Sequence, residues 1–209
     1  MRILFEGSRD ETSWFKKAMR WILYLTLIAG VFGGVVGMVT YARLSEGLPV
    51  FEKIEDYRPK TVSRVFAQDG QLIGEFFRER RVVVPYERIP RRIIQALLAS
   101  EDDRFFDHDG IDYVGIMRAA IANLRAGRVV QGGSTITQQV AKSLIVQAEG
   151  YQQGTAKKLS RKIKEAILAR RLEDSLSKEE ILTLYLNQIF LGNHSYGIQA
   201  AAENYFRKM

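Results

Sequence analysis

The stretch Ser100–Asp112, which reads Ser-Glu-Asp-Asp-Arg-Phe-Phe-Asp-His-Asp-Gly-Ile-Asp, is the part of this 209-residue chain on which the interpretation of the rest depends. Upstream of it, Pro90 suits the first position of a helix. Ile93, Leu97 and Glu101 then follow at intervals of four residues, which places them on one helical face. We therefore expect Glu101 on an apolar stripe near a helix C-terminus, where desolvation and the helix dipole disfavour its charged form and suit it to acid–base work. In the alternative, the helix ends two residues earlier and Glu101 belongs to a polar loop.

An uncharged apolar segment near the N-terminus predicts a membrane helix. Residues 21–42 contain no Asp, Glu, Lys or Arg and are long enough to cross a bilayer. Three basic residues lie within 16–20, but only Arg43 follows closely, so the positive-inside rule places 1–20 in the cytoplasm and the remainder outside. A cleaved signal peptide is the alternative, although its apolar region is usually only about 7 to 15 residues long.

Composition restricts the chemistry. The chain has 46% hydrophobic residues, which is typical of a folded protein, and it has no cysteine, which excludes disulfides and thiolate catalysis. Its two histidines, His108 and His194, show no metal-ligand spacing. The formal net charge of +7 favours anionic partners, and a membrane anchor favours lipid headgroups or a phosphorylated substrate over nucleic acid.

Residues 43–89 are predicted to form a juxtamembrane connector with a β-hairpin. Two strand-like runs, 62–67 and 72–77, flank Gln68-Asp69-Gly70, and Asp-Gly between apolar runs is a strong hairpin signal. Residues 82–84 could add a third short strand.

From residue 90 onward the signals are helical, so the expected fold class is mainly α. Asp112, Ser134 and a capping box of Ser177 with Glu180 mark three helix starts. After the first helix, the expected helices cover 112–124, 134–147, 155–172, 178–191 and 198–206, with a loop at 150–154.

Residues 132–139, Gly-Gly-Ser-Thr-Ile-Thr-Gln-Gln, are a candidate anion site. They place two glycines and two hydroxyls at a helix start, where free N–H groups and the helix dipole favour a phosphate, and Lys142 adds a charge two turns later. The alternative is an ordinary N-cap at Ser134 after a flexible loop. A nucleotide-binding P-loop is rejected, because Gly133 occupies the position of the required lysine.

The helix expected at 155–172 carries a charged face opposite its apolar stripe. Arg161 and Lys162 could hold a pyrophosphate, and Glu165, one turn from Arg161, would stay ionised among these cations. Glu101 and Glu165 would then be two carboxylates in different environments, which suits acid–base work on a sugar. In the alternative the charged face is simply solvated.

Together these motifs resemble those of the peptidoglycan glycosyltransferases, the lysozyme-like glycosyltransferase family 51, and in particular the N-terminal part of class A penicillin-binding proteins. The four matching segments are 101–110, 132–139, 161–165 and 184–206. The resemblance implies a lysozyme-like domain at 90–209 that ends before the family's fifth motif, and Arg207 departs from the family's usual glycine. We therefore expect Leu182, Ile189 and Ile198 to lack part of their packing surface.

By this resemblance, Glu101 is the general base that deprotonates the acceptor 4-hydroxyl of lipid II, which attacks the donor's anomeric carbon and releases undecaprenyl pyrophosphate. Glu165 would organise the pyrophosphate site, and Mg²⁺ or Mn²⁺ could assist there without any other cofactor. The residues expected to bind substrate are Asp102, Ser134, Thr135, Gln138, Lys142, Arg161 and Lys162.

The implied partners are lipid II, the nascent glycan strand, membrane lipid, and cell-wall synthesis proteins that contact the membrane helix. Two other functions stay open. In a lytic enzyme of the same class, Glu101 would be the general acid that cleaves glycan, although a basic pyrophosphate site argues against it. The chain could also be an inactive membrane scaffold.

Overall fold

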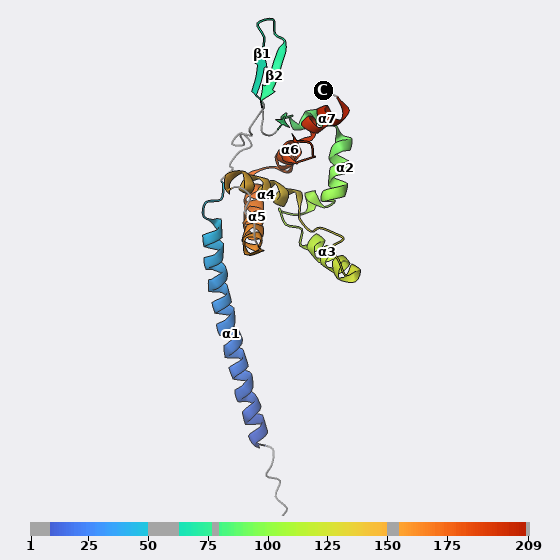
Figure 1. Cartoon of the computed structure of the whole chain (residues 1–209). Helices are drawn as coiled ribbons and strands as arrows, with labels where there is room; N and C mark the ends of the chain where they lie inside the picture. Colours follow the sequence, from blue (N-terminus) through green and yellow to red (C-terminus); the bar gives the residue numbers. More distant parts are fainter. Residues whose placement is uncertain (1–8, 50–62, 77–79, 150–154, 208–209) are drawn as a thin grey trace, which may run out of the picture. The chain divides into compact units, whose positions relative to one another are not determined.

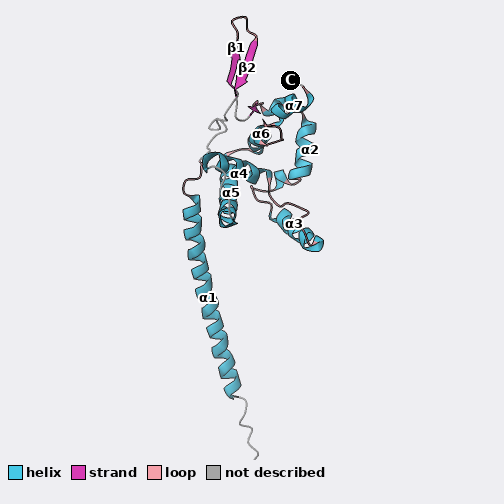
Figure 2. Ribbon diagram, in the orientation of Figure 1, coloured by secondary structure: helices cyan, strands magenta, loops and turns pink. Residues whose placement is uncertain are grey.

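The computed structural model describes residues 9–49, 63–76, 80–149 and 155–207. The chain forms two compact units, which divide between Glu46 and Gly47. Most of the second unit is helical, with two small strand pairs, so the expected mainly α fold class is confirmed (Figure 2). The predicted loop at 150–154 and most of the predicted connector, residues 50–62, lie outside the described residues.

The first unit contains one long helix, α1 (Arg9–Ser45), which extends the predicted membrane span at both ends (Figure 1). Its segment Trp14–Ser45 contains an 18-residue window of mean hydropathy 2.2, and none of that window is buried inside the structure. A bilayer would cover the side chains of a helix this long and apolar.

The predicted hairpin is present as β1 (Ser63–Phe66) and β2 (Leu72–Phe76), which pair antiparallel around a turn at Gly70. The prediction of a third strand at 82–84 is wrong. A two-residue strand lies just before it instead, since β3 (Arg80–Arg81) pairs in parallel with β4 (Ser195–Tyr196).

Residues 82–84 are held by a side chain rather than by a neighbouring strand. The Val84 N–H donates to Asn187 Oδ1 at 2.8 Å, and Asn187 Nδ2 donates to the Val84 carbonyl at 2.9 Å. The Asn187 amide therefore satisfies both backbone groups that a strand neighbour would have used.

The helices follow the predicted order with small shifts in their ends. The capping box of Ser177 with Glu180 is confirmed, and the helix after it ends three residues early because Ile189 adopts an extended conformation. The helical elements are η2 (Tyr86–Arg88), α2 (Arg91–Glu101), η3 (Phe105–Asp107), α3 (Tyr113–Ala126), α4 (Ile136–Glu149), α5 (Thr155–Ser175), α6 (Lys178–Gln188) and α7 (Ile198–Phe206).

The core of the body forms where α4 packs against both α5 and α6 (Figure 1). Fully buried side chains from all three helices meet there, and they are Ile136, Val140, Ile145, Leu168, Leu172, Ile181, Leu182, Leu184 and Leu186. The expectation that Leu182 lacks a packing surface is therefore wrong, while Ile189 and Ile198 are half-buried.

Helix α2 turns a different face inward from the one predicted. Its buried residue is Ile94, whereas Ile93 is 40% exposed and Glu101 is exposed at the last position of the helix. Pro90 is the N-cap rather than the first helical residue. Residues 93, 97 and 101 thus lie on a face of α2 next to the one that Ile94 buries.

Candidate active site

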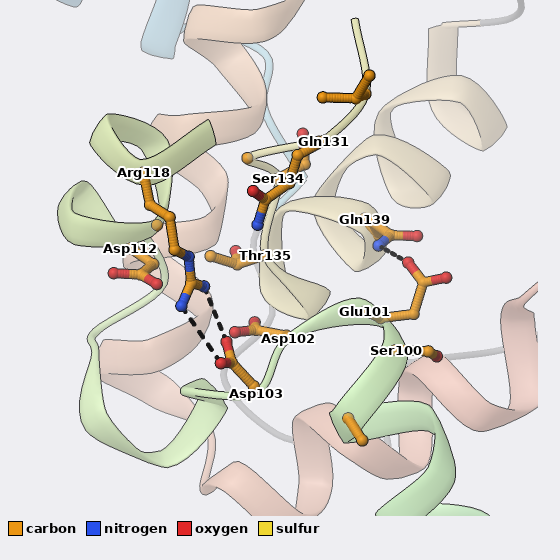
Figure 3. A pocket seen from close by; sticks show the side chains of 15 residues that line it. Ser100, Glu101, Asp102, Asp103, Asp112, Arg118, Gln131, Ser134, Thr135 and Gln139 are labelled. Carbon is orange, nitrogen blue, oxygen red and sulfur yellow. Dashed lines mark hydrogen bonds and ion pairs between the residues drawn. The ribbon is translucent and has the colours of Figure 1, made fainter. Parts of the chain in front are cut away.

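A polar cleft of about 540 Å³ lies between the end of α2, the helix α3 and the loop that precedes α4 (Figure 3). We call it the cleft. Charged and amide side chains dominate its walls, and they include Glu101, Asp103, Arg118, Gln131, Ser134 and Gln139.

Glu101 lies at the edge of the cleft with its carboxylate open to solvent. Its Oε2 accepts a hydrogen bond from Gln139 Nε2 at 2.8 Å, across from α4 (Figure 3). The expectation that Glu101 is desolvated on an apolar stripe is therefore wrong, because α2 buries Ile94 instead. An exposed carboxylate oriented by an amide can accept a proton from a substrate that enters the cleft.

Asp102, expected to bind substrate, is buried and holds the start of α4. Its Oδ2 accepts from the Ile136 N–H at 2.9 Å, and both its oxygens lie 3.1 Å from His108 Nε2. Because the Gly110 N–H donates to His108 Nδ1, the histidine proton must be on Nε2, where it donates to Asp102. Asp102, the residue next to Glu101, therefore connects the end of α2 to the start of α4, the helix that carries Gln139.

Thr135 and Gln138 form a capping box at the start of α4. The Gln138 N–H donates to Thr135 Oγ1 at 3.1 Å, and the Thr135 N–H donates to Gln138 Oε1 at 3.2 Å. Thr135 Oγ1 also donates to the Gly110 carbonyl at 2.6 Å, and both side chains are buried. The prediction of Ser134 as the cap is wrong, and the Thr-x-x-Gln spacing is the sequence signal that would have found the true one.

Ser134 is instead exposed, and it links the segment 132–139 to the segment 161–165. Its Oγ accepts from Lys162 Nζ at 2.8 Å, and the same Nζ lies 3.0 Å from Glu165 Oε2. Arg161 Nε lies 3.3 Å from the other oxygen, Glu165 Oε1. The expected grouping of Arg161, Lys162 and Glu165 is therefore present.

The burial of Glu165 excludes the alternative of a simply solvated charged face at this position. Glu165 is only 3% exposed, and a buried carboxylate is costly unless cations pair with it. The buried carboxylate of Glu165 thus orients Arg161 and Lys162. Lys162 also contacts Ser134, which lines the cleft.

The loop after Glu101 is fixed by a buried aromatic ring. Phe105 is completely buried, and Lys178 Nζ lies 4.5 Å from the centre of its ring. The same Nζ pairs with Glu173 Oε1 at 2.8 Å, and that oxygen also accepts from Thr137 Oγ1 at 2.6 Å. Residues from α4, α5 and α6 therefore hold this loop in place.

Two features of the cleft were not predicted. Arg118 pairs with Asp103 at 3.0 Å across one wall (Figure 3), and this hydrogen bond holds the pKa of Asp103 below its ordinary value. Asn123 fixes the loop before α4, since its Oδ1 accepts from the N–H groups of Val130 and Gln131. No local sequence pattern indicated these two features. Arg118 and Asp103 lie 15 residues apart, and Asn123 lies 7 and 8 residues from Val130 and Gln131.

Lys142 does not line the cleft. It lines a second cavity of about 360 Å³ on the other side of Gln139, a residue that lines both. Among the predicted residues, the cleft therefore brings together Glu101 and Ser134, with Asp102 and Thr135 in its buried wall.

The described residues do not fit a protein-held divalent cation. They contain no group of three or more His, Asp or Glu side chains placed to bind one. Both carboxylate oxygens of Glu165 already face cationic side chains, which would repel a metal ion.

Comparison with known proteins finds similar sequences over most of the chain. The family model described as Transglycosylase matches residues 69–209, beginning within the hairpin turn. Penicillin-binding protein 1A of Vibrio cholerae is 41% identical over 92% of this chain, and that of Aquifex aeolicus is 43% identical over 87%. Penicillin-binding protein 1A of Escherichia coli is 42% identical over 84% of the chain. The chain spans a quarter or less of the length of these relatives, 22%, 25% and 20% respectively.

Proposed function

Because the chain belongs to the transglycosylase family, we propose that it is a peptidoglycan glycosyltransferase that polymerises lipid II into glycan strands. The observation that carries the proposal is the exposed carboxylate of Glu101 at the edge of a polar cleft, oriented by Gln139. The lysozyme-like, mainly α body agrees with this family.

In the proposed reaction, Glu101 accepts the proton of the acceptor sugar's 4-hydroxyl group. The resulting oxygen nucleophile attacks the anomeric carbon of the donor and forms the new glycosidic bond. The bond from that carbon to the pyrophosphate oxygen breaks, with inversion, and undecaprenyl pyrophosphate leaves with the bonding electron pair. The hydrogen bond from Gln139 supports this role by holding the base in one orientation.

The leaving group gains negative charge, so cations are needed beside it. We assign this role to Arg161 and Lys162, which Glu165 orders and of which Lys162 reaches Ser134 at the cleft. Lys142 would add charge from the second cavity. A Mg²⁺ or Mn²⁺ ion, if used, would have to be carried by the pyrophosphate itself.

The geometry favours polymerisation over glycan cleavage. A general acid in a lytic enzyme needs a carboxyl group that an apolar pocket keeps protonated, as in lysozyme, whereas Glu101 is exposed. A glycan cleavage site also has no need of paired cations such as Arg161 and Lys162.

We further propose that α1 anchors the chain in the bacterial plasma membrane with residues 1–20 in the cytoplasm and the body outside. The basic residues before the apolar segment support this orientation. Cell-wall synthesis proteins that contact the chain within the membrane would do so through α1.

The test of the activity is incubation of the detergent-solubilised chain with lipid II, followed by separation of the products by size. Polymer that a muramidase degrades is the expected result. Unchanged lipid II, or release of sugar fragments from added glycan, would contradict the proposal and favour the inactive scaffold or the lytic enzyme, respectively.

A further inference from the structure

Lys178 and Glu173 form an ion pair, which we call the buried pair, that has no part in the proposed reaction. Lys178 Nζ lies 2.8 Å from Glu173 Oε1, and the two side chains are 22% and 6% exposed. The cost of removing both charges from water largely offsets the attraction within such a pair. Lys178 is also the first residue of α6, where the helix dipole disfavours a cation. Stability alone is therefore a weak reason for this pair, and its contacts indicate another.

Lys178 holds the middle of the loop that follows Glu101. Its Nζ donates to the His108 carbonyl at 2.5 Å and lies 4.5 Å from the centre of the Phe105 ring. The ring of the same histidine bonds to Asp102, the residue next to Glu101, with Nε2 3.1 Å from both carboxylate oxygens. A shift of the His108 backbone would therefore move Asp102 and the end of α2.

Glu173 connects the same cation to the helix that carries Gln139. Its Oε1 accepts from Thr137 Oγ1 at 2.6 Å, and Thr137 lies in the first turn of α4, two residues before Gln139. Gln139 in turn donates to Glu101. The buried pair thus contacts both the loop that follows the proposed base and the helix that orients this base.

Two other contacts join this loop to α4, one on each side of the point that the buried pair holds. Asp102 accepts from the Ile136 N–H at the beginning of the loop, and Thr135 donates to the Gly110 carbonyl near its end. A segment fixed only at its ends can still move between them. The buried pair supplies the contact in between, from α5 and α6.

We propose that the buried pair positions the proposed base, because it fixes the loop after Glu101 relative to the helix that carries Gln139. The inference rests on the proposed function. It makes Lys178 and Glu173 positioning residues rather than catalytic ones, since neither lines the cleft. Loss of the pair should therefore lower kcat, which depends on the orientation of the base, and leave KM and donor binding nearly unchanged.

The test separates positioning from stability with a single and a double variant. Lys178→Met removes the ammonium group and leaves a buried carboxylate unpaired, so it should lower the melting temperature. Lys178→Met combined with Glu173→Gln removes both charges, and the new amide can still accept from Thr137, so much of that loss should be recovered. Turnover on lipid II should not recover. We expect kcat to be lower by about 10- to 100-fold in both variants, because the contact with the loop is missing in each.

Control variants make the result specific. Lys178→Arg keeps a cation that can face Phe105 and Glu173, so it should retain more turnover than Lys178→Met. Arg92→Met removes an exposed cation from α2 and should change neither kcat nor the melting temperature. In the double variant, KM and the affinity for a phosphoglycolipid inhibitor of the donor site should stay near those of the unaltered chain.

Amide hydrogen exchange tests the same inference without relying on activity. In the double variant, the amides of residues 102–110 should exchange faster than in the unaltered chain, because the middle of the loop has lost its contact. The amides of residues 140–146, in the core part of α4, should exchange as before.

The outcomes separate the two proposals. If kcat recovers together with the melting temperature in the double variant, the buried pair serves stability alone, which overturns the inference and leaves the proposed function intact. Unchanged exchange across residues 102–110 would overturn the inference as well. An unaltered chain that does not polymerise lipid II would overturn the proposed function and with it the role of the pair in turnover, while the exchange measurement would still show whether the pair holds the loop.

Discussion

At the scale of single residues, the environment of Glu101 differs from the one expected, whereas the cations expected around Glu165 are present. Glu101 is exposed and bonded to a neutral amide, whereas Glu165 is buried between Arg161 and Lys162. The pairing of Glu165 with its cations was predictable from the helical spacing of three and four residues. Its burial was not, because that depends on which face of α5 packs against α4.

Tyr185 predicts a loss of stability at alkaline pH. Its pKa is raised above the ordinary 10.0 by burial and by the charge of Glu101, so the unfolded chain releases this proton at a lower pH than the folded chain. The stabilising effect is fully present below pH 10.0 and is lost as the pH rises toward the folded-state pKa.

The measurement is the free energy of unfolding in denaturant below and above that pH. We expect Tyr185→Phe to flatten the alkaline fall relative to the unaltered chain, since the other tyrosines are common to both. An equally steep fall in both chains would show that Tyr185 does not titrate abnormally.

At the scale of the elements, the start of α4 is the most informative. Thr135→Ala removes the side chain that caps the helix and bonds to the Gly110 carbonyl. Loss of such a cap typically costs about 0.5–2 kcal/mol of unfolding free energy. Ser134→Ala is the matched control, because its exposed hydroxyl does not cap α4 and accepts a hydrogen bond from Lys162 instead.

The expected order in denaturant unfolding is therefore a measurable loss for Thr135→Ala and little change for Ser134→Ala. The reverse order would restore Ser134 as the cap. Lipid II turnover should not follow this order of stability. Ser134→Ala should lower turnover even though it hardly changes stability, since Ser134 contacts Lys162 at the cleft.

The same elements show what sequence patterns can and cannot predict. The capping box of Ser177 with Glu180 and the span of α7 were predicted correctly, because each depends on local spacing. The strand at 82–84 was wrong, because Asn187, 103 residues away from Val84, takes the place of a neighbouring strand. Gln138, assigned to substrate by the family resemblance, is buried in the capping box with Thr135, while its neighbour Gln139 hydrogen-bonds to Glu101.

At the scale of the whole molecule, the apolar helix and its basic flank predict a single-pass topology. A protease added to intact spheroplasts should degrade the body, which begins at Gly47, and should leave a fragment that contains α1. Permeabilised spheroplasts are the control for cleavage from the cytoplasmic side. Protection of the body in intact spheroplasts would contradict the proposed topology.

We infer that Glu101 is the base and that Glu165 acts through the cations it orders. Glu101→Gln keeps the size of the side chain but cannot accept the proton, so turnover on lipid II should fall by roughly 100- to 10,000-fold. Donor binding should change little, because Glu101 contacts Gln139 rather than Arg161 or Lys162.

The most direct measurement pairs turnover on lipid II with binding of a phosphoglycolipid inhibitor of the donor site, in Glu101→Gln and Glu165→Gln. We predict that Glu101→Gln loses turnover and keeps binding, whereas Glu165→Gln loses both, since Arg161 and Lys162 lose the carboxylate between them. An exposed glutamate outside the cleft, in Glu87→Gln, should leave both unchanged. Near-normal turnover in Glu101→Gln, with turnover abolished and binding intact in Glu165→Gln, would contradict the account and make Glu165 the base.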